Sequence, residues 1–432
     1  MTASSQAVLA SGVLPADASP EQRFLLDLHK QPSPAARERL QAAMAQISWP
    51  QILELVTFSQ HPYLDHAIER HELADRVPAG VASDFHAARK DAVLRYLRRK
   101  HEMKSVLEIF KAKQVEVIAL KGLALAEMVY PVPATRHMQD VDLLVRPEQL
   151  DAAVALLKEQ GFRAKQDPRL RMRSPDTDIY GADRSLAKVW PNDVLMIEIH
   201  THLPLISPTA RQEEAELWQR AWTWEENGWE MRVLHPHDEL ILLCMHLGFQ
   251  HGFERCLLWL LDVRLWLERW GPSMDWDGFA SRCRRWQVES YVYLTLCAAL
   301  EWLEAEAAQP ALERLSRPAH ADEIMPLIWE QMWYSKLVVP PPKFLFQAVS
   351  SDPGRGLWGY LRERSRAWRV GFDPLHGRPE TGLGFFWLRL WSDAMKLGTA
   401  IRLGAFGSDN LRRARLVAAR RERLNRLLDD PA

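Results

Sequence analysis

The sequence predicts an α+β fold in which a small mixed sheet lies between two helical regions. Two patterns support this prediction. Apolar residues recur at intervals of three and four over residues 20–110 and again over 207–432, which is typical of amphipathic helices. Short β-branched and alternating segments are concentrated in residues 111–206, which we expect to form the sheet-containing core. Residues 1–19, rich in Ala and Ser, are expected to be disordered.

The elements follow in chain order. Proline removes a backbone donor, so prolines predict that the N-terminal region is divided into short helices. These breaks lie near Pro32, Pro50, Pro62 and Pro78. Within the core, the pattern predicts a strand at 115–120, a helix at 122–130, a loop at 131–137 and a strand at 141–145. A helix from Pro147 to Gln160, which ends at Gly161, is expected next, followed by a hairpin of 185–190 with 193–202. From Pro208 onward we expect helices alone, including one that begins near Pro236 and one at 257–270.

Charge and cysteine content exclude several classes of protein. The 55 Lys and Arg residues nearly balance 56 Asp and Glu, so a formal net charge of -1 provides no global field toward nucleic acid or anionic membranes. The four cysteines form no C-x-x-C pair, which argues against a zinc ribbon and a disulfide framework. We see no signal peptide and no apolar window of the roughly 18–20 residues that a membrane span needs. We therefore expect a cytoplasmic protein.

Two aspartates on one predicted strand are the strongest candidate for chemistry. Asp140 and Asp142, in Q-D-V-D-L-L-V, point to the same face of a strand because side chains alternate along it. Such close carboxylates repel each other unless a cation lies between them or one is protonated, and Mg²⁺ prefers oxygen ligands of this kind. Asp176 and Asp178 have the same spacing but lie in a polar, proline-containing stretch, where we expect a solvated loop.

A third acid lies on the predicted hairpin. In V-L-M-I-E-I-H-T-H, alternation places Glu198 and His200 on the face opposite Ile197 and Ile199. An acid in a mostly apolar strand is costly unless it is paired or bound to metal. Glu198 is therefore expected either to join the two aspartates at a metal or to form a salt bridge with an arginine. His200 is either a functional residue or a satisfied polar neighbour.

Two basic residues lie close to the acids in the sequence. Lys121 and Gly122 follow a strand and begin a helix, where free backbone N–H groups can hold a phosphate. The same pair also occurs in ordinary turns. Arg136 lies in the loop before Asp140, where it either binds a substrate phosphate or neutralises the acid pair.

The order of these features resembles the nucleotidyltransferase superfamily of the DNA polymerase β type, and more closely its bacterial branch of uncharacterised nucleotidyltransferases. The shared pattern is L-K-G, then R, then D-x-D-L-L-V, then E-x-H, and the later segment L-H-P-H-D-E-L-I-L-L-C-M-H is similar too. The resemblance extends from about Trp49 to Leu267. The wider superfamily has Gly-Ser or Gly-Gly at the turn, whereas Gly122 is followed here by Leu123.

This resemblance implies a nucleotidyltransferase core at residues 111–206 and a metal-dependent enzyme. It would transfer a nucleoside monophosphate from a nucleoside triphosphate, ATP in the first instance, to a hydroxyl of a small molecule, a protein or RNA. The cofactor would be Mg²⁺ or Mn²⁺. Asp140, Asp142 and Glu198 would be the catalytic and metal-binding carboxylates, and Lys121, Gly122, Arg136 and His200 would contact the nucleotide and its phosphates. The alternatives are a non-catalytic nucleotide-binding or scaffold protein and a toxin-like enzyme acting on tRNA ends.

Other polar groups are weaker candidates. His246 and His251 are five residues apart, about 140° around an α-helix, so we expect them not to share a face. The Arg-rich helix predicted at 411–428 either touches an anionic partner or presents a solvated face. One helical face carries Arg255, Trp259 and Asp262. These residues either close over the nucleotide base or form a structural ion pair beside a buried Trp.

Overall fold

The computed structural model describes residues 14–15, 17–164, 184–191, 193–203, 213–226, 228–254, 257–333, 420, 423–424 and 426–428. The chain divides into two compact units. The first comprises residues 1–172 with 180–321, and the second comprises 173–179 with 322–432. The first unit contains the sheet and all the residues of the candidate site that the structure describes.

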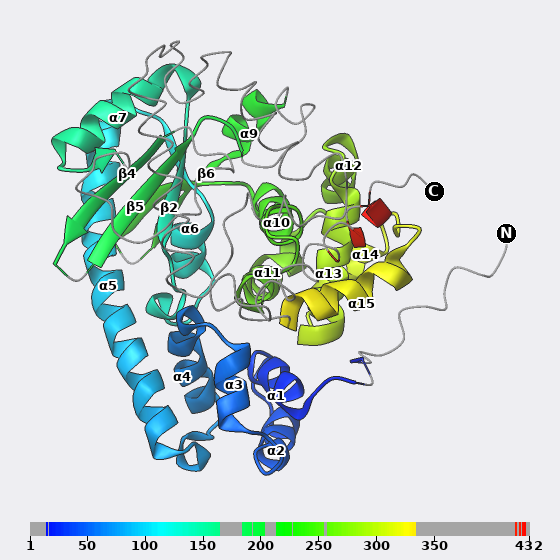
Figure 1. Ribbon diagram of the computed structural model, residues 1–432. Coiled ribbons are helices and arrows are strands. Elements are labelled where there is room, and N and C mark those ends of the chain that lie inside the picture. The colour runs from blue at the N-terminus through cyan, green and yellow to red at the C-terminus, as the bar shows by residue number, and fades with distance from the viewer. Residues whose placement is uncertain are drawn as a thin grey trace, which may run out of the picture. The chain divides into compact units, whose positions relative to one another are not determined.

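The N-terminal region is helical and divided at prolines, as the sequence predicts. Pro50 and Pro62 lie in the first turns of their helices, and Pro78 directly precedes the longest helix. The helices are α1 (Pro20–Leu28), α2 (Pro34–Ala43), α3 (Trp49–Leu55), α4 (His61–Arg70) and α5 (Ala79–Ala112). Figure 1 shows α1 to α4 gathered at one half of α5, with the sheet beside its other half.

Seven strands form one mixed sheet in the order β3-β4-β5-β2-β1-β7-β6. Strand β2 runs parallel to β5 and antiparallel to β1. The predicted strand at 141–145 and the predicted hairpin are therefore confirmed. The strands are β1 (Val117–Ala119), β2 (Asp140–Val145), β3 (Arg163–Ala164), β4 (Arg184–Trp190), β5 (Asp193–His200), β6 (Trp222–Glu226) and β7 (Trp229–Val233).

The last two strands correct the prediction that only helices follow Pro208. Strands β6 and β7 form an antiparallel hairpin, and Val233 pairs with Ala119 so that the hairpin extends the sheet beyond β1. The local sequence W-T-W-E-E-N-G-W-E-M-R-V contains the physical reason. Its Asn-Gly pair is a strong hairpin turn signal, and Gly228 adopts the left-handed φ of +74° that such a turn needs.

The remaining helices lie between the strands and after them in the chain. Pro236 occupies the first turn of α10, as predicted, and the predicted helix at 257–270 is α11. The described helices are α6 (Lys121–Met128), α7 (Leu150–Glu159), α9 (Glu214–Arg220), α10 (Pro236–Met245), α11 (Leu257–Trp270), α12 (Trp276–Arg285), α13 (Glu289–Leu303), α14 (Gln309–Leu312) and α15 (Ala321–Trp333).

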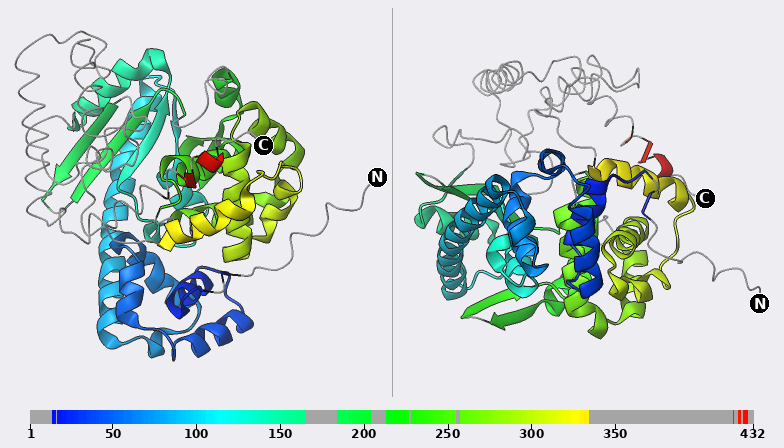
Figure 2. Two further views of the ribbon diagram at one scale, coloured as in Figure 1. Left: turned by 45° about the vertical axis from the view of Figure 1, so that its right-hand side comes forward. Right: turned by 90° about the horizontal axis from the view of Figure 1, so that it is seen from below.

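The core of the first unit lies between the sheet and its helices. Leu143, Leu195, Ile197 and Ile199 are fully buried. Ion pairs also hold α5 to the hairpin β4–β5, and both views in Figure 2 keep this helix beside the sheet. Among the described residues, no helix combines the length and apolar character needed to cross a bilayer.

Candidate functional site

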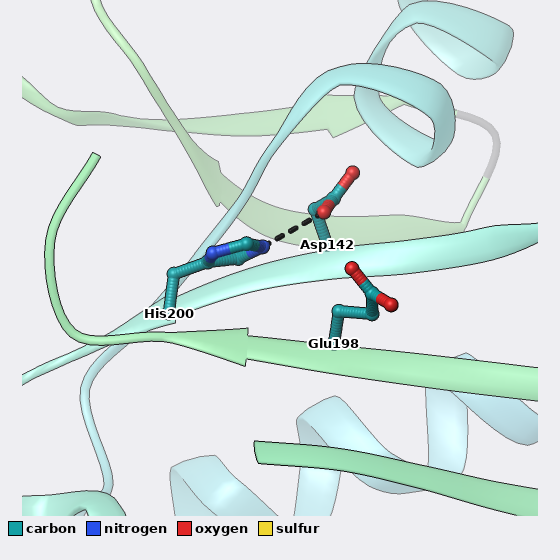
Figure 3. A group of neighbouring side chains, drawn as sticks. All are labelled: Asp142, Glu198 and His200. Carbon is teal, nitrogen blue, oxygen red and sulfur yellow. Dashed lines mark hydrogen bonds and ion pairs between the residues drawn. The ribbon is translucent and has the colours of Figure 1, made fainter. Parts of the chain in front are cut away.

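The site begins with the register between β2 and β5. Asp142 pairs with Glu198 across the parallel strands, so both side chains lie on the same face of the sheet. Asp140 lies two residues before Asp142, and His200 lies two residues after Glu198, which adds both to this face. His200 Nε2 lies 2.8 Å from Asp142 Oδ1 (Figure 3). The alternation read from the sequence thus places the four side chains together.

Three of these residues form a group that could hold a metal ion. Ligand atoms of Asp142, Glu198 and His200 all lie within 4.8 Å of one another. Figure 3 shows the carboxylate of Glu198 next to that of Asp142. Two carboxylates and an imidazole fit a divalent ion, with Mn²⁺ or Zn²⁺ accepting the nitrogen more readily than Mg²⁺. Asp140 is not a member of this group.

Lys121 supplies a positive charge beside Asp142. Its Nζ lies 3.6 Å from Asp142 Oδ2, and the side chain is buried. Strand β1 positions it, because the Leu120 N–H donates to the Asp142 carbonyl oxygen immediately before α6 begins. Lys121 therefore faces the carboxylates from the beginning of a helix, where the sequence analysis places a phosphate contact.

The two aspartates differ in their electrostatics. Burial opposes ionisation of Asp142, but Lys121 and His200 outweigh this cost and hold its pKa below the usual value. Burial and the charge of Asp142 raise the pKa of Asp140. The Lys121 ammonium thus offsets the expected carboxylate repulsion at Asp142, and the effect of the repulsion is a raised pKa of Asp140.

Arg136 pairs with Asp262, an acid 126 residues later in the chain. Its Nη2 donates to Asp262 Oδ2 at 2.8 Å and its Nε donates to Oδ1 at 2.8 Å, which forms a buried fork. The Tyr130 hydroxyl donates to the same carboxylate at 2.6 Å. Arg136 is therefore paired with Asp262 of α11 rather than with Asp140 or Asp142. Arg255, which is expected to share a helical face with Asp262, lies outside the described residues, so an ion pair between these two stays a prediction.

Gly122 provides space for a neighbouring side chain. A Cβ at this position would lie 3.1 Å from Met138 Cγ, which is tighter than an ordinary contact. Met138 belongs to the loop that joins Arg136 to β2. The glycine therefore lets this loop pack closely against α6, whatever it does for a phosphate.

Comparison with known proteins gives the family. Residues 45–304 match the family model described as uncharacterised nucleotidyltransferase, which is more than half of the chain. The chain belongs to this nucleotidyltransferase family. No curated protein matches it. One solved structure, an antigenic nucleotidyltransferase-like protein from Paracoccidioides brasiliensis, is 13% identical, with 51% of this chain and 95% of that chain covered and a TM-score of 0.32.

This nucleotidyltransferase also has a buried acid that the sequence analysis missed. Glu239, in the first turn of α10, accepts the Lys121 N–H through Oε1 at 3.1 Å. Burial raises the pKa of Glu239 to about 8. A signal was present, because Glu239 lies beside the apolar run L-I-L-L and is therefore as costly there as Glu198 is in its strand.

Two histidines of the nucleotidyltransferase are closer than α-helical geometry predicts. Residues His246–Gln250 form a π-helix rather than an α-helix. The wider turn brings positions five apart onto one face. His246 Nε2 and His251 Nε2 lie 3.2 Å apart, so the prediction that they do not share a face was wrong. Both rings also contact Trp259.

Several predicted features lie outside the described residues. They are Asp176, Asp178, Arg255, Cys256 and most of the Arg-rich helix at 411–428. Within the second unit, Arg420 and Arg423 of that predicted helix form ion pairs with Glu330 and Glu323 of α15. Cys244, Cys283 and Cys297 are buried, and among the described residues none of them forms a disulfide.

Proposed function

We propose that this nucleotidyltransferase transfers a nucleoside monophosphate from a nucleoside triphosphate to a hydroxyl acceptor and depends on a divalent cation. One observation carries the proposal within the family. The register of β2 and β5 sets Asp142 directly beside Glu198, with Asp140 on the same face, so acids from two strands converge on one point. Carboxylates gathered in this way serve phosphoryl chemistry by holding cations that neutralise the developing charge.

In this proposal Asp140, Asp142 and Glu198 hold the cation, for which Mg²⁺ or Mn²⁺ is expected. When bound, the ion supplies positive charge to the triphosphate and lowers the pKa of the acceptor hydroxyl. The acceptor hydroxyl loses its proton to solvent and its oxygen forms a bond to the α-phosphorus, while the bond from that phosphorus to the bridging oxygen breaks and pyrophosphate leaves. His200 holds Asp142 in place through the contact between Nε2 and Oδ1.

Lys121 and Arg136 contribute charge in different ways. The Lys121 ammonium faces Asp142 and would contact a phosphate oxygen of a nucleotide bound beside the carboxylates. Arg136 keeps its fork on Asp262 and acts on the nucleotide through its field, which reaches Asp140. Gly122 contributes by letting the Met138 loop close against α6. ATP as the donor and the cytoplasm as the compartment complete the proposal.

Ligand-dependent melting tests whether the site binds metal and nucleotide. A ligand that binds only the folded state stabilises it, by about 2.7 kcal/mol at a hundred times its Kd. Mg²⁺ together with a nucleoside triphosphate should therefore raise the Tm of the protein. Replacing both Asp140 and Asp142 by Asn should remove the metal-dependent part of the rise.

The control is Asp151→Asn, an exposed acid in the first turn of α7 that should leave the rise intact. If no nucleoside triphosphate at millimolar concentration changes the Tm of the wild type with either Mg²⁺ or Mn²⁺, the enzyme proposal fails. The protein would then be a scaffold that retains the family's fold.

A further inference from the structure

The backbone of Lys121 adopts an unusual conformation. Its φ is +42°, in the left-handed region that residues other than glycine rarely occupy. Such conformations persist only where surrounding contacts enforce them, and they gather at functional sites. Only 6% of the Lys121 surface is exposed, so the surrounding atoms restrict where its ammonium can lie.

Glu239 provides the contact that fixes this backbone. The first N–H groups of a helix have no partner within the helix, and Leu120, which precedes α6, has no side chain that can accept one. Glu239 Oε1 accepts the Lys121 N–H from a position 118 residues later in the chain. Glu239 is 1% exposed, and its Oε2 has no hydrogen-bond partner among the described residues.

The first turn of α10 is itself firmly held. His235 caps the helix from the position before Pro236, and its Nδ1 accepts the His237 N–H. Asp238 binds Arg282 at 2.6 Å and Arg220 at 3.1 Å, which anchors the turn to α12 and α9. A carboxyl group on so fixed a turn can impose a backbone geometry on its partner.

We propose that Glu239 is a positioning residue for Lys121. By accepting its N–H, Glu239 holds the left-handed backbone that directs the Lys121 ammonium toward Asp142 and thus toward the phosphates of the nucleotide. This inference rests on the proposed function. The competing view makes Glu239 a plain cap of α6 that stabilises the fold without directing the side chain of Lys121.

A double-mutant cycle separates these two views. If Glu239 acts through Lys121, then Glu239→Ala and Lys121→Met should each weaken binding of a non-reactive ATP analogue in the presence of Mg²⁺ by about ten- to a hundredfold, since a charge-assisted contact has that effect. The double variant should bind no worse than Lys121→Met alone. AMP affinity should stay near that of the wild type in every variant. Isothermal titration calorimetry measures all these constants.

Matched variants distinguish geometry from charge. Glu239→Gln keeps an acceptor oxygen for the Lys121 N–H, so it should restore most of the triphosphate affinity lost in Glu239→Ala. Glu239→Leu fills the volume without an acceptor and should behave as Glu239→Ala does, which also provides for an alanine variant that does not fold. Additive losses in the double variant, or equal losses for AMP and the triphosphate analogue, would overturn the inference.

A crystal structure of the Glu239→Leu variant without nucleotide gives an independent answer. We expect the Lys121 φ to leave the positive region and the distance from Nζ to Asp142 Oδ2 to increase. An unchanged Lys121 would overturn the positioning role whatever the binding data show. If the wild type binds no triphosphate, the proposed function fails, and this structure still decides whether Glu239 positions Lys121.

Discussion

Asp140 and Asp142 share a strand face but differ in their contacts and in the direction of their pKa shifts. Asp142 is the partner of both Lys121 and His200, and these contacts favour its charged form. Asp140 carries the cost of the pair, because burial and the charge of Asp142 raise its pKa. A carboxyl group whose folded-state pKa is raised above its usual value destabilises the fold when it is ionised.

The two aspartates should therefore respond oppositely to substitution in the absence of metal. Asp142→Asn leaves a buried lysine without its carboxylate and should lower the free energy of unfolding by about 1–3 kcal/mol. Asp140→Asn removes a disfavoured charge and should leave that free energy unchanged or slightly raised. Urea unfolding at pH 7 in EDTA measures both. A loss for Asp140→Asn as large as that for Asp142→Asn would contradict this assignment.

At this scale the sequence predicted what strand alternation controls. It placed Glu198 and His200 on one face of their strand and Asp140 and Asp142 on one face of theirs, and it required a partner for the acids. It could not predict that Arg136 pairs with Asp262, because 126 residues separate them. Glu239 and Lys121 are likewise 118 residues apart. Contacts between distant segments depend on how helices pack, which no local pattern specifies.

Among the elements, local patterns predicted the helices and the first strands, whereas two later elements were missed. The β6–β7 hairpin lies in a region dominated by helical periodicity, although Trp224, Trp229 and Met231 alternate as inward-facing residues. The π-helix at His246–Gln250 has no comparable signal, because one extra residue per turn arises from packing rather than from composition. It brought together two histidines that ideal α-helical geometry separates.

Two glycines allow the hairpin turn to be tested against a helical position. Gly228 has a φ of +74° and open space around it, so an added methyl group meets backbone strain alone. Gly228→Ala should lower the free energy of unfolding by about 1 kcal/mol. Gly80 lies exposed in the first turn of α5 with nothing within 4 Å of an added Cβ, so Gly80→Ala should raise it by about 0.5–1 kcal/mol. Equal effects of the two substitutions in thermal unfolding would contradict the left-handed turn.

For the molecule as a whole, buried neutral histidines set the response to acid. Burial lowers the pKa of His29 to about 4, and its Nδ1 lies 2.7 Å from the Leu25 carbonyl oxygen. His29 binds a proton near pH 6.5 in the unfolded chain but only near pH 4 in the folded chain. Stability present above pH 6.5 should therefore be lost as the pH falls, by about 1.4 kcal/mol per pH unit for each such histidine.

Denaturant unfolding between pH 7 and pH 4.5 measures this loss. His29→Gln should reduce the slope of the free energy of unfolding against pH by about 1.4 kcal/mol per pH unit, the contribution of one proton. His101→Gln, at an exposed position on α5, should leave this slope unchanged. If His29→Gln and the wild type show the same slope, the buried histidine is not responsible.

Following the label of a nucleoside triphosphate shows whether the acids of β2 and β5 catalyse nucleotidyl transfer. The protein is incubated with Mg²⁺ and each α-labelled or γ-labelled triphosphate, with cell extract, hydroxylated metabolites and total RNA as acceptors. If these acids catalyse the transfer, α-label alone becomes attached to an acceptor. Asp142→Asn and Glu198→Gln should each reduce transfer by more than about a hundredfold, because several kcal/mol of charge stabilisation is lost, while Asp151→Asn retains it. Transfer of the γ-label, or full α-label transfer by Asp142→Asn, would contradict the account.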